Sequence, residues 1–235
     1  MLAEMKFLLT LSVCAACVVT VVAADDIGTL VEKMGEAYGG RAVLEKLSTV
    51  RESGTVQTAI RMGNSGPVVR LFARPMKLRV EVGTNEVRLV DGPKGWRNGK
   101  EVTGMQYEAM VLQAVRLDLP WQLLTHTDKL VEKDARELGG KHLRVVELPL
   151  DSGISVSAGI EPNTGRILWS SSDSTAGMNF ETHYDDFRKT DGLLFAFKEV
   201  NFANGTKTAD TTLNKIELLK APPEGAFEPQ PQKTP

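Results

Sequence analysis

The residues best placed for chemistry lie in the segment Glu181-Thr182-His183-Tyr184-Asp185-Asp186. If this segment is a strand, Glu181, His183 and Asp185 share one face, because successive side chains of a strand alternate. Two carboxylates and an imidazole on one face could bind a hard or borderline cation, as in a metal-dependent hydrolase. The alternative is a polar outer face that runs into an acidic turn. We predict the second, and therefore no metal site.

Other arrangements typical of catalysis are missing from the sequence. His126, His142 and His183 fall in separate predicted elements and form neither an H-x-x-x-H nor an H-E-x-x-H pattern. The serines at 170–174 lack a G-x-S-x-G elbow. The glycine-rich residues 63–66 precede a predicted strand, whereas a phosphate cradle precedes a helix. The sequence predicts a protein that binds and does not catalyse, without a cofactor.

The composition is that of an ordinary globular protein. The chain has 235 residues, of which 42% are hydrophobic and 25% are charged, and its formal net charge is −2. This length is sufficient for one substantial core or one large β domain. Nucleic-acid binding depends on clustered Lys and Arg, so the near-neutral charge predicts no nucleic-acid partner.

The first 24 residues predict a secretory signal peptide. Lys6 precedes an apolar stretch that ends in Val22-Ala23-Ala24, before two aspartates. We expect cleavage after Ala24 and a periplasmic location. A membrane anchor is the alternative, but about 18 residues that include Thr, Ser and Cys are marginal for a span.

Both cysteines, Cys14 and Cys17, fall inside this segment, so the mature chain would have no thiols and no disulfides. The residues that precede each of them faintly resemble the lipid-attachment box of bacterial lipoproteins. A lipoprotein anchored through Cys14 or Cys17 is therefore an alternative. Val13 is bulky for that box and the residues after Cys17 stay apolar, which favours a soluble exported protein.

The rest of the chain predicts one domain, residues 25–220. Apolar residues recur at helical spacing over residues 25–47, with an interruption at Gly39-Gly40, and the period then changes to two. A second helix is predicted over residues 105–119, ended by Pro120, with a further turn at 121–124. Residues 221–235 are proline-rich and predict a flexible tail. The predicted strands are residues 50–62, 67–73, 76–82, 86–90, 129–138, 142–148, 155–161, 167–171, 178–187, 194–202 and 208–218.

About ten or eleven short strands joined by tight turns indicate an antiparallel meander, which cannot stay flat because strands twist. Residues 71–97 show this best, with three β-type runs separated by Arg74-Pro75, Gly83 to Asn85 and Asp91 to Pro93. We expect an α+β fold: an open antiparallel half-barrel whose concave apolar face is covered by helices.

Several of these residues resemble the LolA/LolB-like superfamily of periplasmic lipoprotein carriers and outer-membrane lipoprotein receptors. Arg74-Pro75 before a strand resembles that family's Arg-Pro junction, and residues 89–96 resemble its Val-x-Asp-Gly-x-x-x-Trp hairpin. Asn163-Thr164-Gly165, Asp191-Gly192 and Phe227 fit its later turns and closing segment. The resemblance spans about residues 25–229. The first strand lacks the carrier's Phe-x-Gln signature, which indicates a divergent branch.

The resemblance implies a cavity for acyl chains under a helical lid, with Arg74 closing the lid through hydrogen bonds to lid-side backbone. A guanidinium suits this role, since it offers five donors in a rigid fork. We expect a monomer that binds a lipid or a lipidated protein. An envelope sensor or interaction protein that uses the same fold to bind a protein is the alternative. The predicted cavity and lid residues are Phe72, Leu78, Val80, Leu89, Trp96, Met105, Met110, Leu112, Trp121, Trp169, Phe180 and Phe195.

Overall fold

The computed structural model describes residues 26–60, 63–150 and 153–229. The predicted signal peptide, with Cys14 and Cys17, lies outside the described residues, as does the end of the tail, 230–235. Among the helices of the described ranges, none is long and apolar enough to cross a membrane.

Helices and strands follow one another in the order that the sequence period predicts. The helices are α1 (Ile27–Ala37), α2 (Arg41–Lys46), α3 (Gly104–Leu117), α4 (Leu119–Thr125) and the 3-10 turn η1 (Thr127–Lys129). The first six strands are β1 (Thr49–Thr58), β2 (Gly66–Ala73), β3 (Lys77–Val82), β4 (Glu86–Asp91), β5 (Lys94–Arg97) and β6 (Lys100–Val102). The later strands are β7 (Val131–Leu138), β8 (Lys141–Pro149), β9 (Ser155–Ile160), β10 (Ile167–Asp173), β11 (Asn179–Thr190), β12 (Leu193–Ala203) and β13 (Thr206–Leu219).

Within the described residues, all thirteen strands form one antiparallel sheet, in the order β6-β5-β4-β3-β2-β1-β13-β12-β11-β10-β9-β8-β7. The sheet consists of two meanders that meet where the first strand pairs with the last. At this β1–β13 seam the register shifts between Ser53 and Gly54. A Cβ on Gly54 would lie 2.2 Å from the carbonyl oxygen of Thr212, so only glycine fits this irregularity without displacing the backbone.

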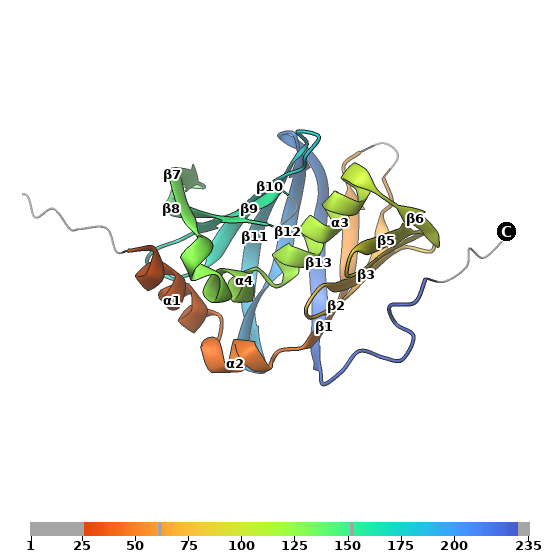
Figure 1. The fold of residues 1–235 in the computed structure, drawn as a ribbon, viewed down its shortest axis with the longest axis horizontal. Helices are drawn as coiled ribbons and strands as arrows, with labels where there is room; N and C mark the ends of the chain where they lie inside the picture. Colours follow the sequence, from red (N-terminus) through yellow and green to blue (C-terminus); the bar gives the residue numbers. More distant parts are fainter. Residues whose placement is uncertain (1–25, 61–62, 151–152, 230–235) are drawn as a thin grey trace, which may run out of the picture.

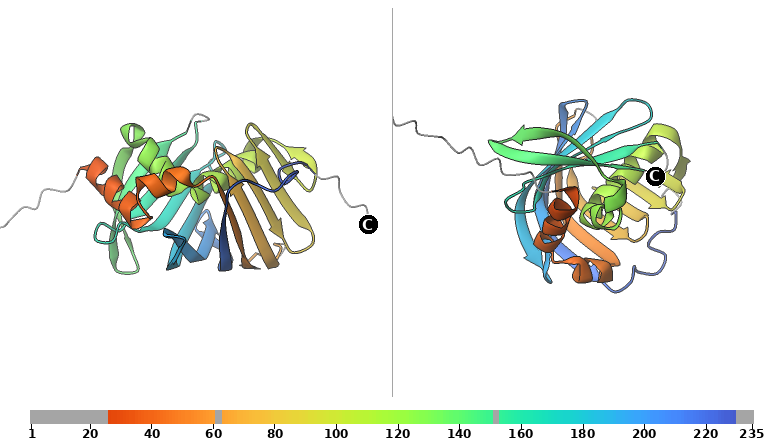
Figure 2. Two further views of the ribbon diagram at one scale, coloured as in Figure 1. Left: turned by 90° about the horizontal axis from the view of Figure 1, so that it is seen from below. Right: turned by 60° about the vertical axis from the view of Figure 1, so that its left-hand side comes forward.

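The helices lie on the concave side of the sheet. The chain leaves one edge at β6 and enters the other edge at β7, and the intervening α3 and α4 cross the concave face (Figure 1). The sheet wraps around these helices, and α1 and α2 lie at one end of the trough (Figure 2). This arrangement confirms the predicted open half-barrel with an α+β fold.

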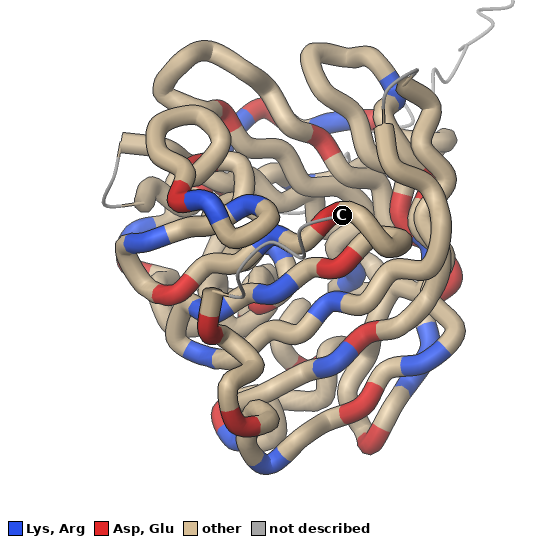
Figure 3. The backbone as a smooth tube through the Cα atoms, turned by 90° about the vertical axis from the view of Figure 1, so that its right-hand side faces the viewer, with Lys and Arg blue, Asp and Glu red and all other residues tan. Residues whose placement is uncertain are grey.

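Apolar side chains of the helices form two clusters against the sheet. α1 and α4 pack Met34, Leu123 and Leu124 against β8, β9 and β10. α3 packs Met110 and Ala114 against β2, β3 and β4. On the outside, basic and acidic residues alternate around the side shown in Figure 3, in keeping with a formal net charge of −2.

Two short strands and one helix start differ from the sequence prediction. Residues 94–102 form β5 and β6, which extend the sheet beyond the eleven predicted strands. Their four and three residues are too few to show a period of two. Pro120 does not simply end a helix, because it occupies the first turn of α4, where its missing N–H costs no hydrogen bond.

The described part of the C-terminal tail, residues 221–229, is docked on the convex face of the sheet. Phe227 is buried against Leu71, Ala73 and Leu89. Arg79 Nη1 donates to the carbonyl oxygen of Ala226 at 3.3 Å. Figure 2 shows this segment crossing the outside of the strands near β1. The expectation of a flexible tail is therefore wrong for these residues, because one aromatic anchor holds an otherwise irregular segment.

We expect Phe227→Ala to lower the free energy of unfolding by about 3 kcal/mol, because it empties a buried aromatic site on the sheet. Urea denaturation measures this change. Glu224→Ala, an exposed change in the same segment, is the control. Equal stability of the two variants would show that the segment is not held by Phe227.

Candidate ligand-binding site

Two cavities lie between the helices and the concave face. The larger has a volume of about 270 Å³ and lies under α3, against β1 to β4 and β11 to β13. The smaller has a volume of about 80 Å³ and lies between α2, the α3–α4 junction and β12. Both cavities are lined by Arg116, Leu117, Tyr184 and Glu199. These four residues therefore mark the boundary between the two cavities, which together we call the lumen.

A buried ion cluster lies at this boundary, and we call Glu52, Arg70 and Glu199 the buried triad. Arg70 on β2 is directly opposite Glu52 on β1, and its Nε lies 2.6 Å from Glu52 Oε2. Its Nη1 and Nη2 donate to the two carboxylate oxygens of Glu199 on β12, at 2.7 and 2.8 Å. In the sheet order, β1 and β13 separate Arg70 from Glu199, so the triad ties the two meanders together across the seam.

Burial dominates the electrostatics of the triad. Burial raises the pKa of Glu52, and the charge of Glu199 raises it further, while Arg70 opposes both effects. Burial works against the charge of Arg70, but the carboxylates of Glu199 and Glu52 outweigh it and raise the pKa of this guanidinium. Arg70 therefore stays charged between the two carboxylates.

Hydrogen-bonded polar side chains extend this charged region along the lumen. The hydroxyls of Ser170 and Tyr184 lie 2.7 Å apart, and burial raises the pKa of Tyr184. Thr182 Oγ1 donates to Asn201 Oδ1 at 3.0 Å. The expected apolar cavity therefore also contains polar and charged side chains. They lie among apolar lining residues such as Val68, Val80 and Leu117.

Arg74 joins the sheet to the helices that cover it. Its Nη1 donates to the carbonyl oxygen of Leu44 in α2 at 2.6 Å, and its Nε and Nη2 donate to the carboxylate of Asp118 at 2.7 to 3.0 Å. The guanidinium also lies 4.7 Å from the ring centroid of Trp121 in α4. Burial raises the pKa of Asp118, against the effect of Arg74. One side chain thus contacts α2, the α3–α4 junction and α4.

Nine of the twelve predicted cavity and lid residues lie on the concave side or on the helix that covers it. Val80 and Phe180 line the larger cavity, and Trp121 and Phe195 line the smaller one. Met105, at the start of α3, is exposed. The others fill space between α3 and the sheet or are fully buried: Phe72, Leu78, Met110 and Leu112.

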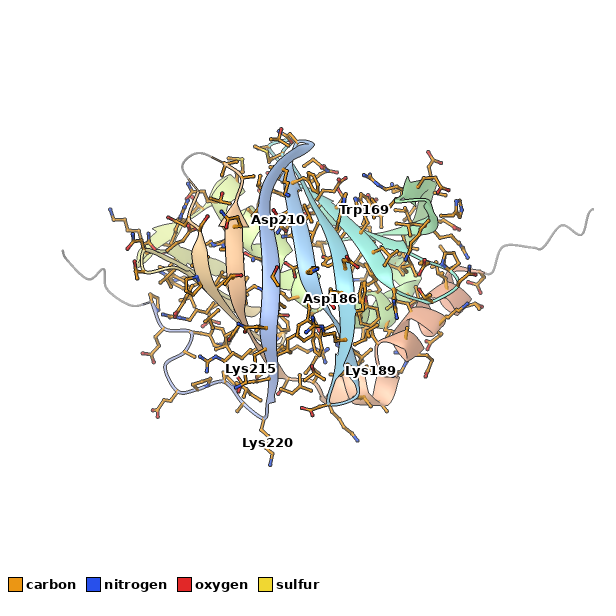
Figure 4. The ribbon with its side chains drawn as sticks, turned by 180° about the vertical axis from the view of Figure 1, so that it is seen from behind. Trp169, Asp186, Lys189, Asp210, Lys215 and Lys220 are labelled. Atoms are coloured by element: carbon orange, nitrogen blue, oxygen red, sulfur yellow. The ribbon has the colours of Figure 1, made fainter. Side chains whose placement is uncertain are left out.

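Three predicted cavity residues lie on the opposite, convex face. Leu89 and Trp96 pack in the cluster around Phe227. Trp169 packs with Leu143, Val145 and Leu168, and Figure 4 shows it from the convex side. For these three the prediction is wrong. The docked tail covers apolar side chains on the outer face of β4, and a register irregularity between Ile167 and Trp169 breaks the alternation of β10.

The alternative metal site does not form. Glu181 Oε2 pairs with Arg136 at 3.1 Å, and its Oε1 lies 3.2 Å from His183 Nε2. In the described part of the chain, no group of three or more His, Cys, Asp or Glu side chains is arranged to bind a metal ion. The hypothesis of a metal-dependent hydrolase based on Glu181, His183 and Asp185 is therefore not supported.

The sequence analysis missed the residues of the polar lumen. Arg70 occupies an inward position of β2 between apolar inward residues, as in Val68-x-Arg70-x-Phe72, and Glu52 lies directly opposite it on β1. A charge in an otherwise apolar row is a recognisable signal of a buried ion pair. Arg116 and Asp118 gave no such signal, because a helix end is commonly polar.

Comparison with solved structures identifies the fold. One similar structure is a DUF1329 family protein from Desulfovibrio piger, with a TM-score of 0.51 and 8% identity over 87% of this chain and 98% of that chain. Another is a LolA superfamily protein from Nitrosomonas europaea, with a TM-score of 0.48 and 11% identity over 87% and 98% of the two chains. Searches of protein-family models and of curated proteins find no match.

The structural likenesses cover most of the chain at very low identity. The likeness to the DUF1329 family protein, with a TM-score of 0.51, shows that the two chains share a fold over most of their length. Shared fold does not establish shared ligand, so the function has to be argued from the site.

The raised pKa of Glu52 predicts a pH-dependent stability. The folded protein binds this proton more tightly than the unfolded chain, so the free energy of unfolding falls as the pH rises from about 4.5 through the folded-state pKa. Glu52→Gln cannot ionise and still offers Arg70 an acceptor. We expect this variant to gain stability relative to wild type as the pH rises, measured by urea denaturation at a series of pH values.

The control for this experiment is Glu45→Gln, an exposed change in α2. Its difference from wild type should stay nearly constant with pH. A constant difference for Glu52→Gln as well would contradict the assignment of the raised pKa.

Proposed function

We propose that the protein reversibly binds an acyl-bearing ligand, a lipid or a lipidated protein, inside the half-barrel. The observation that carries this proposal is the cavity of about 270 Å³ between α3 and the concave face. Its volume is near the lower end of small-molecule sites, which span about 300–1,000 Å³. Its lining combines polar and apolar side chains, and the apolar ones include Val56, Val82 and Phe202 along the strands.

Burial of a hydrocarbon chain supplies the binding free energy in this proposal. Each methylene removed from water contributes about 0.8 kcal/mol. α3 covers the chain, and Met110 on its inner face has a flexible thioether that repacks around different shapes. We call α3 the cover. It packs on the sheet through its side chains, so it can move without breaking hydrogen bonds between strands.

We propose that Arg74 holds this cover closed, in the role that the family resemblance implies. The contacts of Arg74 support this role, since they reach α2, Asp118 at the α3–α4 junction and the ring of Trp121. The predicted export signal agrees with a monomeric carrier of the periplasm that acts by binding and not by catalysis. The described residues do not include that signal.

The proposal is tested by isolating the protein from membranes and analysing an organic extract by mass spectrometry. A lipid in stoichiometric amount, together with saturable displacement of a fluorescent fatty acid, supports it. Neither lipid nor displacement would overturn it. A stoichiometric protein partner recovered without lipid would favour the alternative of an envelope interaction protein.

We expect Ala209→Phe to weaken fatty-acid binding at least tenfold, because the added ring occupies the larger cavity that Ala209 lines. Thr212→Phe is the matched control. Thr212 is exposed and alternates onto the face of β13 that carries Asp210, which Figure 4 shows from the convex side. Fluorescence titration measures both variants, and equal affinities would place the ligand elsewhere.

We expect Arg74→Leu to accelerate fatty-acid release about tenfold, because α2 and the α3–α4 junction lose their tie to the sheet. It should also lower the free energy of unfolding by roughly 3 kcal/mol, since Asp118 remains buried without a cation. Stopped-flow displacement and urea denaturation measure these effects. Arg51→Leu, on the exposed side of β1, is the control. An unchanged release rate would contradict the closing role.

A further inference from the structure

Arg116 differs from the other arginines that line the lumen. It lies in the last turn of α3, and its side chain lines both cavities. Arg70 is held by the carboxylates of Glu52 and Glu199, and Arg88 lies 3.4 Å from Glu86 and donates to Gln113. Within residues 26–60, 63–150 and 153–229, the Arg116 guanidinium has no ion pair and no hydrogen-bond partner.

The carboxylates near Arg116 are already engaged. Glu199 is bound by two nitrogens of Arg70, and Glu181, which also lines the larger cavity, pairs with Arg136. Arg116 is thus the one cation of this lining that has no carboxylate partner among the described residues. A partly buried cation in this position is stabilised by an anion that enters from outside, because the attraction between charges is stronger away from bulk water.

The neighbouring groups respond to this positive charge. Burial lowers the pKa of Arg88, and the charges of Arg97, Arg70 and Arg116 lower it further, against the effect of Glu86. Tyr184 lies on the other side of the boundary and its hydroxyl is paired with Ser170. Arg116 therefore adds positive charge beside Arg70 and Arg88, and it presents a rigid five-donor fork.

We propose that Arg116 binds the ionised acid group of an amphiphile, a carboxylate or a phosphate, whose hydrocarbon chain lies in the larger cavity. The guanidinium fork matches the two oxygens of either group. From Arg116 the apolar walls continue along β1, β3 and β12 to Val56, Val82 and Phe202, which leaves a path for the chain. The inference rests on the proposed function and adds the class of ligand to it.

The experiment compares ligands that share a chain and differ in the head group. Dodecanoate, dodecyl phosphate and dodecanol are titrated by calorimetry into the full mature protein, and inorganic phosphate is tested alone. We expect both acids to bind at least tenfold more tightly than the alcohol, because a charge-assisted pair is available only to them. We also expect this preference to weaken at high salt.

The variant Arg116→Gln should reduce the affinity for both acids about tenfold and the affinity for dodecanol much less, so that the preference for the acids falls. Arg116→Lys should retain part of the preference, since it keeps the charge without the fork. Arg51→Gln, an exposed change on the outer face of β1, is the matched control. Arg116 makes no ion pair or hydrogen bond within the described residues, so its replacement breaks none there, and circular dichroism checks the fold.

Each outcome decides between the two proposals. Equal binding of acid and alcohol by the wild type would overturn the inference about Arg116 and leave the acyl-binding function standing. Binding of none of the three amphiphiles would overturn both. Inorganic phosphate that binds as tightly as dodecyl phosphate would show that the site takes a free anion and needs no chain, which also overturns the inference. An unchanged acid preference in Arg116→Gln would assign that preference to another group.

Discussion

A thirteen-stranded antiparallel sheet must curl, because each strand is rotated relative to its neighbour and the rotations accumulate. The curl creates a concave face too large to leave exposed. In this chain the connection between the two sheet edges solves that problem, since the path from β6 to β7 crosses the trough as α3 and α4. The cavities, the contacts of Arg74 and the position of Arg116 all follow from helices that cross a curved sheet.

The lumen under these helices is divided by charge. The buried triad links β1, β2 and β12 across the seam between the two meanders, with every member almost fully buried. A buried ion cluster is costly to form and contributes more to the specificity of an arrangement than to its stability. In this fold it positions the two meanders relative to each other and places a polar region in the middle of an otherwise apolar container.

Prediction from the sequence succeeded wherever the signal was local. The change of period at Ser48, the turns with Asn and Gly, and the helix around Met110 follow from one segment at a time, and the structure confirms them. It failed for Leu89, Trp96 and Trp169, which pack in apolar clusters on the convex face. A strand pattern cannot say which face is concave when a distant tail, anchored by Phe227, covers the other one.

The sequence by itself determined the elements, their antiparallel order and the Arg74-Pro75 junction, because propensity and period act over a few residues. It also contained the charges of Glu52, Arg70 and Glu199 without indicating that they meet. Only the tertiary structure decided that meeting, since the pairing of β1 with β13 joins segments about 160 residues apart. The same closure leaves Arg116 facing the lumen without a carboxylate of its own. The pairing of distant strands thus brings Glu52, Arg70 and Glu199 together, and no local sequence pattern predicts that contact.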